Sequence, residues 1–185
     1  AWGLQRALVG HFEKVWMEPD TSIWEMRSAP RHFTYSKVMA WVAFDRAVKL
    51  YQLALQAGRW SAAEIGALRT KRGEALANAG RGAEAAREFL AAAGSGPSSD
   101  SRELRRRAAE QLLITGHIDA GREVLQAVLA AVGLRLAPTP ARALAGLLAR
   151  RLQLALRGLR FTPRPAGEIA PGQLARVDAS WAASV

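Results

Sequence analysis

The chain has 185 residues, half of them hydrophobic, so it can bury one or two modest cores but cannot house a large multidomain enzyme. Cysteine is absent, which excludes disulfides, thiolate metal sites and a cysteine nucleophile. The net charge of +10 suits an anionic partner. The three histidines show no metal-ligand spacing, so we expect no metal and no cofactor.

Hydropathy and the N-terminal sequence predict a cytoplasmic protein. Apolar runs of about 18 residues without a charge, the length that crosses a membrane, do not occur. The first residues, AWGLQRALVGHFEK, lack the basic start, apolar stretch and cleavage site of a signal peptide.

Composition changes sharply near residue 41. Four of the six tryptophans lie in the first 41 residues, and the rest of the chain is rich in Ala, Leu and Arg. No Pro/Gly linker separates the two parts, because AWVAFDRAVKLYQLALQ reads as one amphipathic helix. We therefore predict one continuous helix over residues 37–57. Tyr51 and Ala54 should pack against a helix at 66–79, and Trp41 should pack on the N-terminal segment.

From Gly66 onward the spacing of small, large and turn residues follows the 34-residue tetratricopeptide pattern of paired helices. A second, weaker unit follows 36 residues later, and no segment shows the alternation of a β-strand. The predicted fold is all-α, with tetratricopeptide-like helical hairpins that form an α-solenoid. The residues at pattern positions are Gly73, Leu76, Gly80, Ala85, Phe89, Ala92 and Pro97, then Ala109, Leu112, Gly116, Gly121, Leu125 and Val128.

A different pattern occupies the N-terminal part: P-D-x-G-I-W-E-x-R, then H-F-x-x-S-K and a helix that bears a tryptophan. Ser22 stands at the glycine of this pattern. Ser28 follows the final arginine, at a place where glycine is also usual. The matching residues are Pro19, Asp20, Ile23, Trp24, Glu25, Arg27, His32, Phe33, Ser36, Lys37 and Trp41.

On these residues the first 48 residues resemble bacterial glucoamylase- and trehalase-type glycoside hydrolases. The resemblance implies a helix-loop-helix fragment of an (α/α) barrel. It also implies that Glu25 is the general acid, that Trp24 is a sugar-stacking platform, and that Arg27 and Lys37 lie near substrate hydroxyls. A carboxylic acid beside an indole loses solvation, which raises its pKa and suits it to protonate a glycosidic oxygen.

Inverting hydrolysis also needs a second carboxylate, roughly 6.5 to 9.5 Å from the first. The resemblance stops before the family's catalytic base, so we expect this chain alone to be inactive and to bind carbohydrate only if the missing barrel is supplied. The later glutamates lie on Arg-rich amphipathic helices, where we expect ordinary helix ion pairs. They are Glu74, Glu84, Glu88, Glu103, Glu110 and Glu123.

The remaining chain, from about residue 44 to 185, resembles the tetratricopeptide region of large bacterial serine/threonine kinases that carry an ATPase-like module. Phosphate-binding loops, H-R-D and D-F-G are absent, so no kinase activity is implied. The predicted domains are therefore a hydrolase-like fragment, 1–48, and a repeat region, 49–185.

Two functions follow from this organisation. The favoured one is a non-catalytic scaffold for protein–protein interaction, the regulatory region of a signalling kinase, which holds a peptide in a groove lined by Arg69, Arg72, Leu76, Arg105 and Gln111. The alternative is a fragment of a glucoamylase- or trehalase-type inverting glycoside hydrolase in carbohydrate metabolism.

Two basic segments remain. The cluster Arg102, Arg105, Arg106 and Arg107 lacks interleaved aromatic residues, so we expect a solvated helix start and no nucleic-acid site. The stretch ARALAGLLARRLQLALRGLR is basic and amphipathic and could lie on a membrane surface. Packing as the next repeat helix is the favoured interpretation, so we expect no membrane partner.

Overall fold

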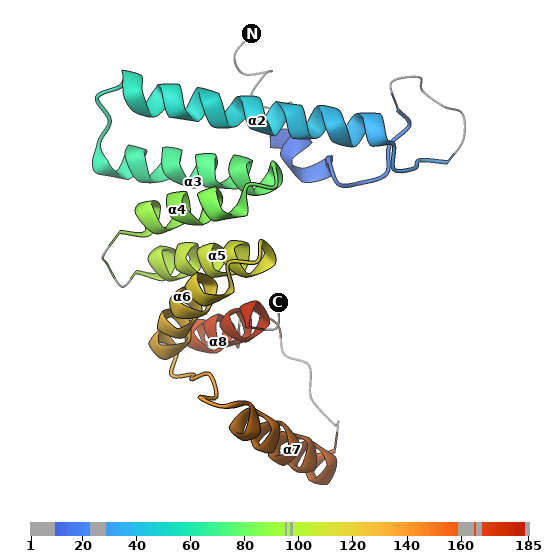
Figure 1. Ribbon diagram of the computed structural model, residues 1–185, viewed down its shortest axis with the longest axis vertical. Coiled ribbons are helices and arrows are strands. Elements are labelled where there is room, and N and C mark those ends of the chain that lie inside the picture. Colours follow the sequence, from blue (N-terminus) through green and yellow to red (C-terminus); the bar gives the residue numbers. More distant parts are fainter. Residues whose placement is uncertain are drawn as a thin grey trace. The chain divides into compact units, whose positions relative to one another are not determined.

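The computed structural model is helical throughout most of the residues it describes, which are 10–22, 29–94, 96, 98–158, 165 and 168–183 (Figure 1). This confirms the all-α prediction, and these ranges contain no β-strand. The helices are α2 (Thr34–Ala57), α3 (Ala62–Asn78), α4 (Gly82–Ala93), α5 (Ser99–Ile114), α6 (Ile118–Ala131), α7 (Pro140–Arg157) and α8 (Pro171–Ala182). Residues 10–15 are also helical.

The chain divides into two compact units, Ala1–Ala85 and Ala86–Val185, and the division falls inside α4. The boundary predicted between residues 48 and 49 separates two kinds of sequence and not two compact units. It stays a prediction.

Local sequence sets where the helices begin and end. Ser61 caps α3 in a reciprocal capping box with Glu64. Thr139 caps α7, with a proline in the first turn. The turns after α3 and α5 contain Gly80 and Gly116, whose φ values of 77° and 81° disfavour any residue with a Cβ. These two glycines were the predicted turn positions, and the structure confirms them.

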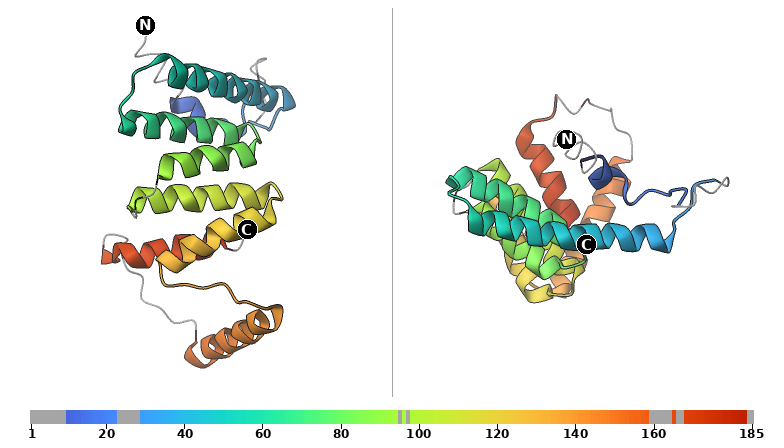
Figure 2. Two further views of the ribbon diagram at one scale, coloured as in Figure 1. Left: turned by 60° about the vertical axis from the view of Figure 1, so that its left-hand side comes forward. Right: turned by 90° about the horizontal axis from the view of Figure 1, so that it is seen from above.

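The first unit is built on α2, which runs unbroken beside α3 (Figure 2). The predicted continuous helix over 37–57 is therefore confirmed. Its buried core joins Ala40 and Phe44 to Ala79, which follows α3. The predicted packing of Trp41 on the N-terminal segment stays a prediction. Phe12 and Trp16 of that segment pack on the core of Ala40 and Phe44, whereas Trp41 is half exposed and its indole Nε1 donates to the carbonyl oxygen of Ala79 at 2.9 Å.

The second unit packs α5 against α6, with α8 resting on both. Its buried core contains Ala109 of α5, Leu125, Val128 and Leu129 of α6, and Ala179 and Ala182 of α8. The close approach of α5 and α6 depends on Gly121, because a Cβ there would lie 2.9 Å from Cδ2 of Leu113. This matches the small residue predicted at that position.

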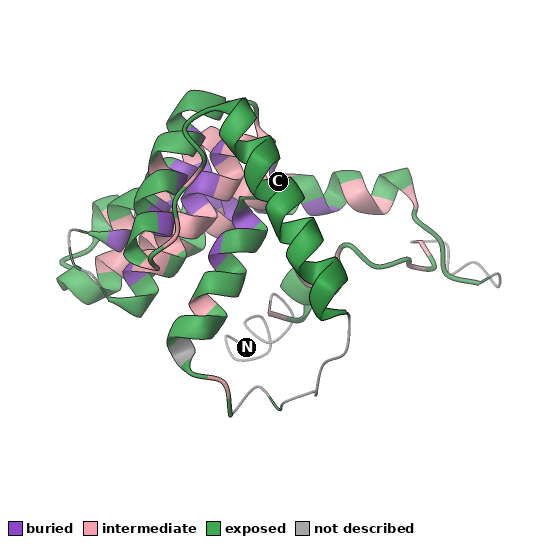
Figure 3. Cartoon of the chain, turned by 90° about the horizontal axis from the view of Figure 1, so that it is seen from below, coloured by how far each residue is buried: buried purple, intermediate pink, exposed green. Residues whose placement is uncertain are grey.

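Helix α7 lies outside both cores. All 18 of its residues are exposed, and Figure 3 shows it in the colour of exposed residues. The prediction that this helix packs as a further repeat helix is therefore wrong for the described structure. No helix in the described part of the chain is long and apolar enough to cross a bilayer.

Candidate functional site

The loop that carries the N-terminal motif is closed at its base by two backbone hydrogen bonds. Asp20 and Arg31 pair antiparallel, with N···O distances of 2.8 and 2.9 Å. Residues 23–28, and with them the predicted site residues Trp24, Glu25 and Arg27, lie outside the described residues. The structure therefore describes the framework of the loop on either side of the predicted general acid.

The carboxylate of Asp20 ties this base to helix α2. One oxygen, Oδ1, accepts the backbone N–H of Ser22 at 2.6 Å and the hydroxyl of Ser36 at 2.9 Å. Ser36 lies in the first turn of α2, so the bond joins the motif loop to the helix that follows it. Ser22 has φ of 63°, a left-handed conformation that favours glycine, which is the residue usual at this place in the motif.

Lys37, in the first turn of α2, holds the segment that leads into the loop. Its Nζ donates to the carbonyl oxygens of Trp16 at 2.6 Å and Glu18 at 2.7 Å. An ammonium group has three N–H donors, so these two bonds leave one. The predicted contact between Lys37 and a substrate hydroxyl stays a prediction, and the described role of the side chain is to fix the backbone before Asp20.

Three aromatic side chains pack the N-terminal helical segment onto α2. The rings of Phe12 and Phe44 have centroids 5.6 Å apart, and Trp16 meets Phe44 edge-on at 5.3 Å. Sequence reasoning did not assign this cluster. The signal was present, because Phe12 and Trp16 are four residues apart and therefore share one helix face.

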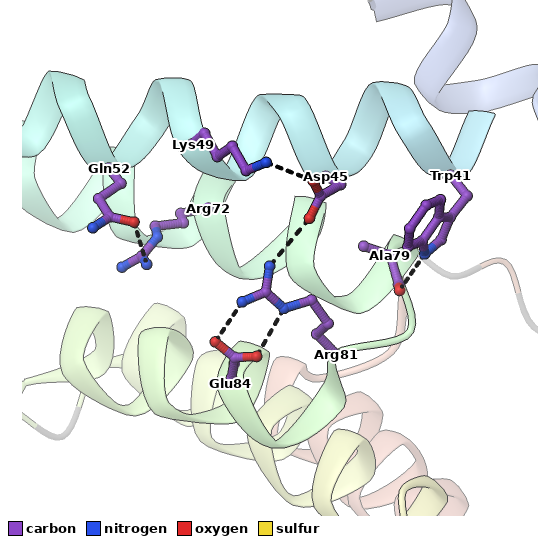
Figure 4. A network of polar contacts seen from close by, with 8 residues as sticks. All are labelled: Trp41, Asp45, Lys49, Gln52, Arg72, Ala79, Arg81 and Glu84. Carbon is purple, nitrogen blue, oxygen red and sulfur yellow. Dashed lines mark hydrogen bonds and ion pairs between the residues drawn. The ribbon is translucent and has the colours of Figure 1, made fainter. Parts of the chain in front are cut away.

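A polar network holds α2 to the turn after α3 (Figure 4). The guanidinium of Arg81 bonds Glu84 in two places, Nε to Oε1 at 2.7 Å and Nη2 to Oε2 at 2.8 Å, and its Nη1 lies 3.3 Å from Asp45 Oδ1. Lys49 pairs with the other oxygen of Asp45 at 3.2 Å. The bond to Glu84, and the charges of Glu84 and Asp45, raise the pKa of Arg81.

Several of the glutamates that the sequence assigned to helix ion pairs are engaged in that way. Glu74 pairs with Lys71 at 2.9 Å, and Glu103 and Glu110 both pair with Arg106. The prediction is confirmed for these three and for Glu84. Within the described ranges, no three His, Asp or Glu side chains are grouped as metal ligands would be.

The groove predicted for a peptide also differs from the structure. Leu76 was expected on its lining, but this side chain is 1% exposed and belongs to the core. Arg105 donates to the carbonyl oxygen of Gly94 at 2.7 Å, which satisfies a backbone group after α4. Both side chains therefore have structural roles.

Comparison with known proteins identifies a family and several relatives that this chain resembles. The sequence model of glycosyl hydrolases family 15 matches residues 1–129. The trehalase of Mycolicibacterium smegmatis is 50% identical over 52 residues, 28% of this chain and 8% of that protein. The trehalase of Mycobacterium tuberculosis is 53% identical over 49 residues, 26% and 7% of the two chains. The trehalase of Thermoplasma acidophilum is 43% identical over 49 residues, 26% and 8%. No solved structure matches.

This family match corrects the favoured functional prediction. It extends to residue 129 and so includes α3 to α5 and most of α6, the helices that were assigned to a repeat scaffold. The prediction of a non-catalytic scaffold from a signalling kinase is therefore wrong, and the glycoside hydrolase alternative is supported. The chain spans less than a tenth of the length of the curated relatives it matches. Because the match covers most of its length, this chain belongs to glycosyl hydrolases family 15.

Proposed function

We propose that this chain supplies the catalytic-acid segment of an inverting glycoside hydrolase that acts on trehalose. The observation that carries the proposal is the braced loop base, in which Asp20, Ser36 and Lys37 join the motif to α2. The trehalases that match this chain support the choice of substrate.

In this proposal Glu25 is the general acid. In the sequence, Glu25 lies near the middle of the segment between Asp20 and Arg31, the two residues whose backbones pair at the base of the loop. The protonated carboxyl gives its proton to the glycosidic oxygen as the bond to the anomeric carbon breaks. The carboxylate that activates water on the opposite face of the sugar ring comes from other parts of the enzyme.

The neighbouring residues have supporting roles. Trp24 stacks on a sugar ring, and its indole removes water from Glu25, which favours the protonated acid. Arg27 and the remaining N–H of Lys37 donate to sugar hydroxyls. Lys37 then serves two purposes, because the bonds to Trp16 and Glu18 that hold the loop also fix the direction of its third donor.

We also place residues 10–57 within an (α/α) barrel, as one of its helix-loop-helix pieces. The exposed apolar side chains of α2 support this placement, since it exposes Tyr35, Val38 and Met39 near its start and Leu50 and Leu53 near its end. A second helix of a barrel would cover such a surface.

A graft tests the proposal. Residues 10–57 of this chain replace the corresponding helix-loop-helix in the trehalase of Mycolicibacterium smegmatis, and glucose release from trehalose is measured. The graft should retain activity, and the same graft with Glu25→Gln should lose about 10² to 10⁴ in kcat.

The matched control is Glu18→Gln, a carboxylate in the same segment, whose backbone oxygen accepts from Lys37. This variant should keep the activity of the graft. A folded but inactive graft, or equal losses for the two glutamine variants, would refute the role of Glu25. The ungrafted 185-residue chain should release no measurable glucose.

A further inference from the structure

Helix α7 sits in the most basic part of the chain. Residues 124–167 contain no Asp, Glu, Lys or His, so their charge comes from arginine alone. These arginines account for +7 of the net charge of +10. They are Arg135, Arg142, Arg150, Arg151, Arg157, Arg160 and Arg164.

The same helix exposes large apolar side chains. Their exposed fractions range from 50% for Leu154 to 81% for Leu156. Water-exposed leucines at this density are unfavourable, because each buried leucine side chain would gain about 1.5 to 3 kcal/mol. The exposed leucines of α7 are Leu144, Leu147, Leu148, Leu152, Leu154 and Leu156.

The two kinds of side chain lie mostly on opposite sides of the helix. Leu144, Leu148 and Leu152 follow each other at i, i+4 and form one apolar row. Leu147 and Leu154 lie seven residues apart and add a second row beside the first. At about 3.6 residues per turn, Arg142, Arg150 and Arg157 fall on the side away from the first row.

We propose that α7 lies flat on the surface of an anionic lipid bilayer, with its leucines among the acyl chains and its arginines at the phosphates. Helices that bind in this way carry an apolar face and a strongly basic polar side, and they are too polar as a whole to span the bilayer. Arg151 lies between the two leucine rows, and its long stem allows the guanidinium to reach the headgroups. None of these residues belongs to the segment proposed to carry the general acid, so binding of lipid by α7 is a function beyond the proposed one.

The positive charge of α7 and the width of its apolar stripe favour lipid over a second helix as the partner of this face. A second copy of α7 would bring arginines against arginines without a single carboxylate in either helix. The two adjacent leucine rows make an apolar stripe wider than the narrow seam of a two-helix coiled coil, so one further helix would leave part of the stripe in water. From the sequence alone we expected α7 to pack within the fold. In the structure all 18 of its residues are exposed, so that expectation no longer favours a partner within the chain.

Vesicle sedimentation of the full 185-residue chain tests this proposal. The probes are vesicles of phosphatidylcholine alone and of phosphatidylcholine mixed with phosphatidylglycerol. The chain should sediment with the anionic vesicles, remain in solution with the neutral ones, and dissociate as salt is raised. Failure to bind anionic vesicles would overturn the proposal and would point to an acidic protein as the partner.

Matched variants separate insertion from simple charge attraction. Leu148→Glu with Leu152→Glu should weaken binding by about tenfold or more, because it removes the apolar row. Leu50→Glu with Leu53→Glu in α2 makes the same charge change at leucines of similar exposure and should have a much smaller effect. Arg150→Gln with Arg151→Gln should weaken binding about thirtyfold, since each arginine near the surface contributes about a factor of five. Equal losses in the two leucine pairs would overturn the proposal.

Discussion

Asp20 Oδ1 accepts the backbone N–H of Ser22 at 2.6 Å, and Ser22 has φ of 63°. The hydrogen bond offsets part of the cost of a left-handed conformation, which is roughly 1 to 2 kcal/mol for a residue with a Cβ. Ser22→Gly should therefore stabilise the N-terminal unit by about 1 kcal/mol, as measured by urea unfolding. Ser22→Val should destabilise it, because a β-branched side chain tolerates this φ least. An unchanged or lower stability for Ser22→Gly would contradict the strained turn.

Lys37→Met should loosen the segment before the motif loop. The substitution keeps most of the side-chain length and removes two charge-assisted hydrogen bonds, to Trp16 and Glu18, so we expect a loss of about 1 to 2 kcal/mol. Lys49→Met is the control, since Lys49 has a 71% exposed side chain and its ion pair with Asp45 lies at the surface. Thermal unfolding of the two variants should differ by several degrees, and equal melting temperatures would show that Lys37 does not brace the loop.

The cap of α3 should respond to acid. Bonds from the hydroxyl and the backbone N–H of Ser61 lower the pKa of Glu64 from its ordinary value of 4.5. A lowered folded-state pKa means that this contribution is present above the unfolded value and is lost as pH falls through the folded pKa. In an NMR titration, Ser61→Ala should move the pKa of Glu64 upward toward 4.5. A pKa that does not move would show that the hydroxyl contributes nothing to the cap.

Gly121→Ala should destabilise the second unit. Its new Cβ would lie 2.9 Å from Cγ of Leu113 and 3.2 Å from Cβ of Leu112, closer than packed atoms allow. Overpacking of this kind costs about 1 to 3 kcal/mol, against about 1 kcal/mol gained in helix propensity. Gly146→Ala in α7 is the matched control, because a Cβ there meets no atom within 4 Å. That variant should gain helicity, so circular dichroism should change in opposite directions for the two.

Much of the helical framework follows from local sequence. Turn glycines such as Gly80 and Gly116 and the unbroken apolar periodicity near residue 44 predict helices that the structure contains. The packing partners were harder to predict. Trp41 bonds the carbonyl oxygen of Ala79, and the two are 38 residues apart, so no local pattern indicates the contact. The anchoring role of Lys37 was missed for the same reason, because it depends on backbone oxygens that carry no sequence signal.

The functional prediction failed because small and large residues at fixed spacing are a general requirement of packed helix pairs. Gly121 and Leu125 satisfy the close packing of α5 and α6. That packing does not distinguish a repeat scaffold from a helical enzyme. The motif around Glu25 was the more specific signal, since its residue types serve chemistry that packing does not demand.

The dependence of hydrolysis on the leaving group tests the central claim most directly. Cleavage of trehalose expels glucose as a sugar alkoxide that needs a proton, whereas cleavage of α-glucosyl fluoride expels fluoride, which leaves without general acid help. In the grafted trehalase, Glu25→Gln should lower kcat on trehalose by about 10² to 10⁴ and leave kcat on α-glucosyl fluoride within a few-fold of the unsubstituted graft. Equal losses on both substrates, or no loss on trehalose, would contradict the assignment of Glu25 as the general acid.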